Sequence, residues 1–465
     1  MSIMARWFPP MVLMFVLQTT TPENDDACQV GLSALKWPQL TCTNVDSRYF
    51  ENFGRPLNRT HWIKCVRCAI GIVDEKTFHF PKNNISFLEL QESQILTLRK
   101  FAFSSFFLLK LLNLRGNRID YLEPKCFAGL KRLMHLDLSS NFLKILTNNI
   151  FSELGNLDIL NLNRNQIFYT QPYAFAGLMN LKYLYLNHND LKKLEDKMFN
   201  HLTNLKILYI EHNGIVEIHQ NAFLNLRNLN YLYLNNNSIS FLVQYNFKPL
   251  TSLVGLQLRS NDLKEIQVSS FNGLKHLKSL YLGGNKISAV KPYGFIGLDS
   301  LVILDLIRNN FSSIDFSYFD KMKSLYILWL NENSISEFKI SSKDEVQISL
   351  GVIDLSLNNL SNFNYSLLYS KIPKIKEIVL ANNSFSCDFF TNMYSFTEEK
   401  NISLCMSATC NYNDTNSYYD TVCSEQFMTT DNSLNVTDFS TDSAPILSIT
   451  RLYIFLYTFY SILFC

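Results

Sequence analysis

The sequence predicts an α/β fold of the solenoid type: a right-handed coil, bent into a horseshoe, with a parallel β-sheet on its concave face and disulfide-stapled caps. A leucine frame that ends in asparagine recurs along the chain, a phenylalanine recurs with the same period, and cysteines gather on either side of the repeats. Because each repeat contacts only its neighbours, one continuous stack is expected in place of the about three globular domains that the length alone would suggest.

Each repeat is predicted to contain one short strand. Leu184 and Leu186 lie two positions apart and therefore point to one side of such a strand, whereas Tyr183 and Tyr185 point to the other side. The leucine side is predicted to be core and the tyrosine side to be exposed. Asn189 then ends the strand, because its amide can hydrogen-bond to the backbone of its own loop and of a neighbouring coil.

The asparagine slot defines thirteen repeats, predicted for residues 85–383. The spacing is 24 residues in most of the chain and 25 residues before each of the last two repeats, and a serine takes the slot in the first repeat. Stacked coils are expected to share a ladder of these side chains. The slot is held by Ser93, Asn117, Asn141, Asn165, Asn189, Asn213, Asn237, Asn261, Asn285, Asn309, Asn333, Asn358 and Asn383.

A phenylalanine marks the far side of each coil, again with a period of 24 residues. It is expected to fill the core behind the leucines. Because this return segment is wider than the strand, the stack is predicted to curve with its strands on the inside. These residues are Phe103, Phe127, Phe151, Phe175, Phe199, Phe223, Phe247, Phe271, Phe295 and Phe319.

Two groups of cysteines predict caps at residues 21–84 and 384–423. Terminal coils would otherwise expose an apolar end, and disulfides are typical of secreted proteins. Each group of four allows three pairings. The Cys65–Cys68 spacing also suits half of a zinc site or a redox pair, but the sequence contains no second C-x-x-C. The predicted disulfide residues are Cys28, Cys42, Cys65, Cys68, Cys387, Cys405, Cys410 and Cys423, whereas Cys126 is expected to be a buried free thiol.

The start of the chain predicts secretion. Residues 1–20 contain one basic residue, Arg6, followed by an apolar run and a polar exit, which is typical of a secretory signal peptide. The mature chain is therefore expected outside the cell.

The end of the chain predicts attachment to a membrane. Residues 424–445 are rich in Ser, Thr, Asp and Asn and are predicted to be a flexible stalk. Residues 446–465 are mostly apolar and, with Asp442 and Ser443 as the attachment site, match a glycosylphosphatidylinositol anchor signal. The alternative is a membrane span from Ile446, which would place Arg451 within the bilayer. The expected location is the extracellular face of the plasma membrane, or the medium if this run is not an anchor signal.

Aromatic side chains occupy many outward slots of the predicted strands. Tyrosine and tryptophan are enriched at binding hot spots, so a ligand-binding surface is expected here. Alternatively, these rings only pack on one another across the sheet. The same slot also holds Gln257 and Asp305, and two histidines share a slot in adjacent repeats, where they are either solvated or a pH-sensitive pair. The predicted ligand-binding residues are Tyr183, Tyr185, Tyr209, Tyr231, Tyr233, Tyr281, Trp329, His188 and His212.

Charge and motifs exclude several functional classes. The net charge is +2, and charges of both signs line the predicted concave face, so a nucleic-acid partner is not expected. The sequence contains no zinc-protease, serine-hydrolase or nucleotide-binding motif, so no enzymatic activity, metal or cofactor is expected. Ten N-x-(S/T) sequons predict glycosylation, at Asn58, Asn84, Asn236, Asn310, Asn359, Asn364, Asn382, Asn401, Asn413 and Asn435.

The repeat frame and the flanking cysteines resemble those of animal extracellular leucine-rich-repeat proteins over about residues 28–423. The C-terminal cap departs from the family pattern Asn-Pro-Phe-x-Cys-x-Cys, since the segment from Asn383 to Phe389 lacks the proline and the second cysteine. The family includes Toll-like receptors, adhesion proteins of the chaoptin and connectin type, and matrix proteoglycans. The resemblance implies binding of a protein ligand or cell-surface receptor without catalysis.

Extracellular recognition or adhesion is therefore the expected function. A secreted matrix or innate-immune scaffold and a ligand-binding co-receptor for a separate signalling chain are the alternatives.

Overall fold

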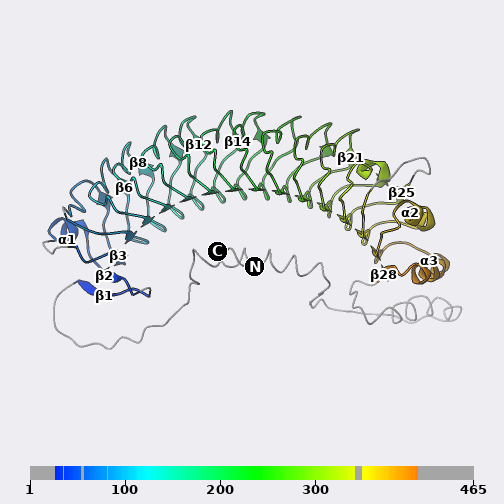
Figure 1. Cartoon of the computed structure of the whole chain (residues 1–465), viewed down its shortest axis with the longest axis horizontal. Coiled ribbons are helices and arrows are strands. Elements are labelled where there is room, and N and C mark those ends of the chain that lie inside the picture. Colours follow the sequence, from blue (N-terminus) through cyan, green and yellow to red (C-terminus); the bar gives the residue numbers. More distant parts are fainter. Residues whose placement is uncertain (1–26, 35, 54–56, 81, 341–347, 407–465) are drawn as a thin grey trace, which may run out of the picture.

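The chain forms a curved stack of coils with a parallel sheet along its inner side, as predicted (Figure 1). The computed structural model describes residues 27–34, 36–53, 57–80, 82–340 and 348–406. The N-terminal strands lie at one end of the arc, and helices α2 (Tyr365–Lys371) and α3 (Cys387–Glu399) lie at the other. The predicted signal peptide, stalk and anchor segment, together with Cys410, Cys423, Asn413, Asn435, Asp442 and Ser443, lie outside the described residues.

The concave sheet contains seventeen strands of the described residues. Strand β1 (Cys28–Leu32) pairs antiparallel with β2 (Pro38–Thr43), and each later strand pairs parallel with that of the next coil. Equivalent residues face one another, as Leu184 faces Leu208. The remaining strands are β3 (Trp62–Val66), β5 (Phe87–Glu89), β7 (Leu111–Asn113), β9 (His135–Asp137), β11 (Ile159–Asn161), β13 (Tyr183–Tyr185), β15 (Ile207–Tyr209), β17 (Tyr231–Tyr233), β18 (Gly255–Gln257), β20 (Ser279–Tyr281), β22 (Ile303–Asp305), β24 (Ile327–Trp329), β26 (Val352–Asp354), β27 (Glu377–Val379) and β28 (Ser403–Cys405).

Turns and short strands form most of the rest of each coil; among the described residues the α-helices lie toward the two ends of the stack, and one 3-10 helix lies in the coil of β22. The helices are α1 (Ser47–Glu51), the 3-10 helix η1 (Phe316–Phe319), α2 and α3. The outer strands are β4 (Ile72–Val73), β6 (Thr97–Leu98), β8 (Tyr121–Leu122), β10 (Ile145–Leu146), β12 (Tyr169–Thr170), β14 (Lys193–Leu194), β16 (Glu217–Ile218), β19 (Glu265–Ile266), β21 (Ala289–Val290), β23 (Ser313–Asp315) and β25 (Glu337–Lys339).

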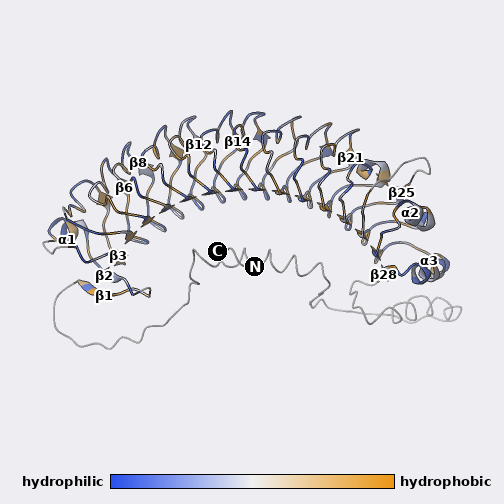
Figure 2. Cartoon of the chain, in the orientation of Figure 1, coloured by the Kyte–Doolittle hydropathy of each residue, from blue (hydrophilic) through white to orange (hydrophobic). Residues whose placement is uncertain are grey.

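Leucines and phenylalanines fill the interior, and each coil carries hydrophobic and hydrophilic segments side by side (Figure 2). Leu184 and Leu186 are fully buried, which confirms the predicted core side of the strand. The predicted phenylalanine series forms a continuous row from Phe103 to Phe319, with successive ring centroids 5.8–6.5 Å apart. Cys126 is a buried free thiol, as expected, and burial raises its pKa well above the ordinary range.

The asparagine ladder is present, and Asn261 illustrates its hydrogen bonds. Its Nδ2 donates to the carbonyl of Leu258 in its own coil at 3.1 Å and to that of Leu234 in the preceding coil at 3.0 Å. Its Oδ1 accepts from the backbone N–H of Ile239 at 3.1 Å. Leu234 O also accepts from Asn237 at 3.0 Å, so each such carbonyl serves two amides. The ladder is therefore one connected network across coils.

A second asparagine series, which the sequence analysis did not single out, lies on the opposite flank of the coils. Asn156, Asn180, Asn204 and Asn228 each donate to a backbone carbonyl 25 residues earlier, at 2.8–2.9 Å. These bonds join consecutive coils just before the concave strand begins.

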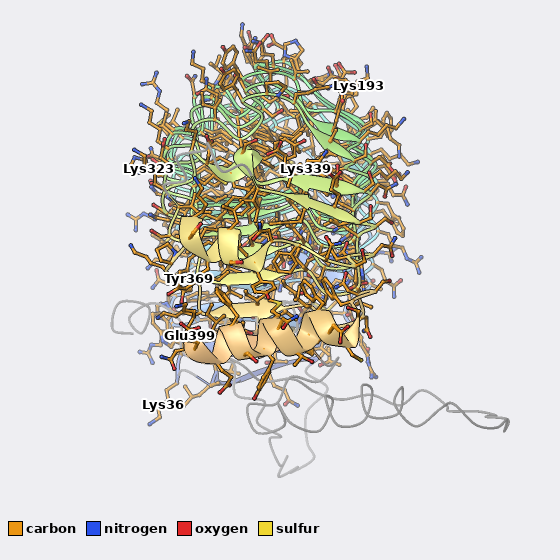
Figure 3. All side chains as sticks on the ribbon, turned by 90° about the vertical axis from the view of Figure 1, so that its right-hand side faces the viewer. Lys36, Lys193, Lys323, Lys339, Tyr369 and Glu399 are labelled. Carbon is orange, nitrogen blue, oxygen red and sulfur yellow. A yellow bond between two sulfur atoms is a disulfide. The ribbon has the colours of Figure 1, made fainter. Side chains whose placement is uncertain are left out.

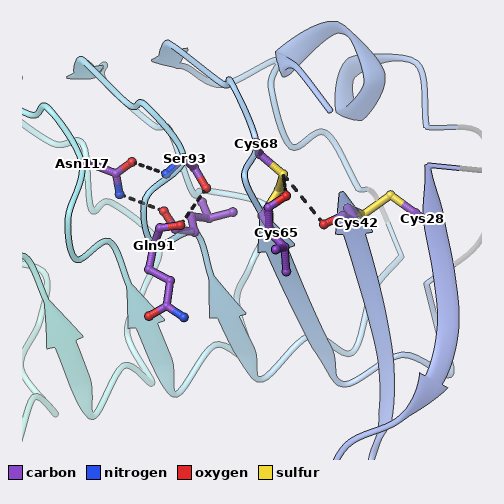
Figure 4. Close-up of a disulfide and its surroundings, with 9 residues drawn as sticks. Cys28, Cys42, Cys65, Cys68, Gln91, Ser93 and Asn117 are labelled. Atoms are coloured by element: carbon purple, nitrogen blue, oxygen red, sulfur yellow. Dashed lines mark hydrogen bonds between the residues drawn. A yellow bond between two sulfur atoms is a disulfide. The ribbon is translucent and has the colours of Figure 1, made fainter. Parts of the chain in front are cut away.

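Two further coils precede the thirteen predicted ones in the same sheet. Strand β3 places Ile63 and Cys65 where later coils have leucines, and Cys68 takes the asparagine slot. Cys65 and Cys68 form a disulfide, and a second disulfide joins Cys28 to Cys42 (Figure 4). These bonds give the N-terminal pairing, and cysteines joined in this way cannot bind zinc as thiolates in this state.

The C-terminal cap continues the sheet through β28. Cys387, at the start of α3, and Cys405, at the end of β28, are both disulfide-bonded. Among the described residues, no helix is both long and apolar enough to cross a membrane.

Candidate binding surface

Three of the predicted tyrosines form one stack on the concave face. The ring centroids of Tyr185 and Tyr209 lie 4.7 Å apart with 6° between the planes, and those of Tyr209 and Tyr233 lie 4.6 Å apart with 13°. The spacing follows from that of parallel strands, which is ~4.8 Å. All three rings are half-buried, and burial raises the pKa of Tyr185 to about 12. The stack is thus a rigid apolar strip with its outer edge open to solvent.

The other predicted aromatic residues lie on the same face but not in this stack. Tyr183 and Tyr231 flank Ile207 in the column two residues earlier. The ring of Tyr231 covers Gly255, where an added Cβ would lie 2.8 Å from a ring carbon. Gln257 separates Tyr281 from the tyrosine stack, and Asp305 separates Trp329 from Tyr281. Both Tyr281 and Trp329 are half-buried.

The two predicted histidines also stack. The ring centroids of His188 and His212 lie 4.4 Å apart, with 6° between the planes, and His212 Nε2 lies 3.2 Å from Nδ2 of Asn236. Partial burial lowers the pKa of both histidines, and His212 and Arg164 lower that of His188 further. The pair therefore favours the neutral state beside the tyrosine stack.

Two outward slots depart from the expectation, because Gln257 and Asp305 are buried. Arg259 contacts the buried Asp305: its guanidinium lies 4.8 Å from the ring centroid of Tyr281, and its Nε lies 2.5 Å from Oδ2 of Asp305. The arginine therefore spans two coils. Gly283 leaves room for this contact, since a Cβ there would lie 2.9 Å from the same carboxylate oxygen. Burial raises the pKa of Asp305, and Arg259 acts in the opposite direction.

Carboxylates gather beyond Trp329 at the C-terminal end of the face. Asp354 and Glu377 lie on adjacent strands, both half-buried. Burial raises the pKa of each, and a neighbouring carboxylate, Glu332 for Asp354 and Asp354 for Glu377, raises it further. A cation placed against this end would relieve that repulsion.

The repeat region matches a known protein family. Five overlapping segments, residues 83–143, 108–167, 155–215, 203–263 and 251–311, match the model of the leucine-rich-repeat family. The fold is a leucine-rich-repeat solenoid. No curated protein matches the sequence as a relative.

Several solved leucine-rich-repeat structures resemble this one. A chain of the TLR13–ssRNA13 complex has a TM-score of 0.62 at 24% identity, over 77% of this chain and 56% of that one. A chain of the Drosophila Toll–Spatzle complex has a TM-score of 0.53 at 17% identity, over 75% and 54%. A chain of the LRIM1/APL1C complex has a TM-score of 0.53 at 19% identity, over 77% and 72%. This solenoid spans about half the length of the first two, and the likeness concerns the fold.

The described sequons lie on the surface of the leucine-rich-repeat stack and avoid one part of it. The asparagines of all eight are exposed: Asn58, Asn84, Asn236, Asn310, Asn359, Asn364, Asn382 and Asn401. The sequence has no sequon between Asn84 and Asn236, a segment that contains Tyr185 and Tyr209. No glycan would be attached within this segment itself, whereas a glycan on Asn236 would lie beside His212 at one end of the tyrosine stack.

The Arg259 bridge is the main feature of this face that sequence reasoning missed. Its signal is the pair Gly283-Gly284, which interrupts outward slots that carry side chains in most repeats. A glycine pair beside a buried acid and an arginine indicates a side chain that crosses the intervening coil.

Proposed function

We propose that this chain is an extracellular recognition or adhesion protein that binds a protein ligand on its concave face. The stack of Tyr185, Tyr209 and Tyr233 carries the proposal, since it presents three rings at one coil spacing on the concave side. Rigid aromatic groups lose little conformational entropy when a partner binds, and such groups dominate interface energetics.

The charges of the face support a protein ligand over a nucleic acid. The TLR13 structure contains ssRNA13 and the Toll structure contains Spatzle, so leucine-rich-repeat proteins bind both classes. Here the concave strands carry carboxylates toward both ends of the sheet, which would repel a phosphate backbone. The ligand proposed is a protein whose apolar side chains cover the tyrosine stack and whose basic side chains approach the C-terminal acids. The outward carboxylates of the concave strands are Glu89, Asp137, Asp354 and Glu377, whereas Asp305 is buried against Arg259.

Truncation of the tyrosines tests the proposal. Replacing Tyr185 and Tyr209 together by alanine is expected to weaken binding by more than ~1 kcal/mol for each central residue. Loss of the stacking contacts is expected to lower the free energy of unfolding by only ~0.5–1.5 kcal/mol per ring pair. The measurement is binding of wild type and variant to the proteins that the chain selects from an array of extracellular domains, with melting curves for both.

An outer aromatic pair provides the control. Tyr173 and Tyr293, which are 54% and 72% exposed and follow outer strands, are replaced by alanine in a matched variant. This variant is expected to bind as wild type does. Full affinity in the concave variant together with weak binding in the outer variant would move the site to the outer face.

We propose surface display from the predicted signal peptide and the predicted anchor signal of the C-terminal apolar run. Phosphatidylinositol-specific phospholipase C is expected to release the protein from expressing cells. Full retention after treatment would favour the membrane span, and appearance in untreated medium would favour the secreted scaffold. The co-receptor alternative requires a spanning partner that co-purifies with the released chain.

A further inference from the structure

One flank of the stack carries exposed apolar side chains in five of six consecutive coils, from that of β5 to that of β15, and the coil of β13 contributes none. They follow the asparagine slot, up to and including the first residue of the outer strands, away from the concave tyrosines. In Figure 3 the label Lys193 marks this flank, and the label Lys323 marks the opposite flank. The side chains are 41–52% exposed, and we call them the flank patch: Leu96, Tyr121, Phe142, Ile145, Phe168, Tyr169 and Val216.

The flank patch is a local property of this part of the stack. In the five coils that follow, the position of Leu96, Phe168 and Val216 is occupied by Ser240, Lys264, Ser288, Ser312 and Ser336. The patch also coincides with the segment between Asn84 and Asn236 that has no sequon. Exposed apolar side chains that gather on one face of a protein are typical of a protein interface.

Charged residues around the flank patch are arranged with opposite signs at its two ends. One residue past the asparagine slot, the coil of β7 has Arg118 and the coil of β13 has Asp190. Two residues further on, the same coils have Asp120 and Lys192. All four side chains are exposed. If a second copy lies against this flank with its coils in the opposite order, each of these charged residues therefore faces a residue of opposite charge.

We propose that the flank patch joins two copies of this chain in a symmetric, antiparallel dimer. The twofold axis lies in the plane of the flank, between the coils of β9 and β11, and runs along the direction of the coils. It reverses the order of the coils in the second copy, so that each residue faces the same position of a different coil. Arg118 of one copy then faces Asp190 of its partner, and Asp120 faces Lys192. The two arcs lie face to face with the same curvature, which leaves both concave faces open.

The same axis pairs four of the seven patch residues with one another, and it places Tyr121 against Lys193 and Phe142 against Gln166. Leu96 faces Val216, and Ile145 faces Tyr169. One coil beyond the patch at each end, Ile72 and Phe241, 41% and 48% exposed, face one another as well. Lys144 is brought over the ring of Phe168, which suits a cation–π contact. Apolar and charged residues thus support one register, and a partner of unrelated sequence would not require that symmetry.

Charge exchange tests the dimer. Sedimentation of the full glycosylated chain, purified in non-ionic detergent, is expected to show a monomer–dimer equilibrium. Asp120→Lys and Lys192→Asp are each expected to weaken the dimer by roughly tenfold or more, because each brings like charges together twice in the symmetric contact. The double variant Asp120→Lys/Lys192→Asp is expected to recover wild-type association.

Phe168→Ala is expected to weaken the dimer without charge change, and melting curves identify any variant that fails to fold. Lys323→Asp on the opposite flank is the control and is expected to associate as wild type does. A wild type that stays monomeric up to ~100 µM, well above a micromolar dissociation constant, overturns the dimer and leaves the patch to a different protein. Failure of the double variant to recover association, or weakening by Lys323→Asp, overturns this twofold contact.

Discussion

The residue in the asparagine slot makes different bonds in the first coils and in the middle of the stack. In the middle, Asn261 donates to carbonyls of two coils and accepts from a third group, so its amide couples neighbours. In the coil of β3, Cys68 takes this slot and bonds covalently to Cys65 of the same coil. Its Sγ lies 4.0 Å from the carbonyl of Cys42, where an asparagine would donate, but a disulfide sulfur has no hydrogen to give (Figure 4).

The coil between them is intermediate. Ser93 Oγ donates to Gln91 O within its own coil at 3.2 Å, and the link to the next coil comes from Asn117, which donates to Leu90 O at 2.8 Å. The slot therefore changes from a bond within one coil to a bond between coils as the stack gains neighbours. The comparison teaches that a ladder side chain stabilises a coil through the preceding coil, whereas an end coil needs a bond of its own.

The largest effect is expected from breaking the ladder in the middle. Asn261→Leu leaves the N–H of Ile239 unpaired and removes one of two amides from each bonded carbonyl. The free energy of unfolding is expected to fall by about 2–4 kcal/mol, because a buried unpaired group costs roughly 1–3 kcal/mol and each shared bond adds less. Denaturant titration measures this loss. Gln220→Leu, at an exposed amide, is the control and is expected to change stability by less than ~0.5 kcal/mol.

A smaller effect is expected from the terminal staple. Replacing Cys65 and Cys68 together by serine opens a loop with a sequence separation of 3, for which chain entropy gives about 2 kcal/mol. The loss is expected to be confined to the first coils. Hydrogen exchange followed by mass spectrometry should show faster exchange there and unchanged exchange around Asn261. Loss of protection along the whole stack would contradict the assignment of this disulfide to a single coil.

The smallest effect is expected from the contact between His188 and His212, which occupy the same slot in adjacent coils in the middle of the stack. His212→Gln is expected to raise the pKa of His188 toward its ordinary value of 6.5, because a neighbouring imidazolium would no longer oppose protonation. In the folded wild type the pKa of both histidines is lowered. As the pH falls, these histidines therefore bind protons in the unfolded chain at a higher pH than in the folded chain. The histidine contribution to stability is therefore complete above pH 6.5 and is lost as the pH falls below it. NMR titration of the ring protons measures the shift, and an unchanged His188 would argue against direct contact of the rings.

Periodicity made the stack predictable, since one frame determined strand position, the ladder and the phenylalanine row. The tyrosine stack followed for the same reason, because equal slots in adjacent coils must meet. The sequence did not predict the structure where other residues occupy the repeating positions. Val45 and Cys68 in the asparagine slot hid the two first coils, and the burial of Asp305 depends on Arg259, 46 residues away. Such contacts between different slots depend on side-chain length and on the space that glycines leave.

The two aromatic rows give the arc a one-sided elasticity. On the inside, tyrosine rings are 4.6–4.7 Å apart and already touch, whereas phenylalanine rings on the outside are 5.8–6.5 Å apart. In the three coils of the tyrosine stack, tightening the bend would compress the tyrosine rings, whereas opening it would separate these rings and bring the outer rings closer together. Under mechanical load the molecule should therefore resist closure more than opening, and a ligand too wide for the resting arc could spread it at lower cost than a small one could draw it inward.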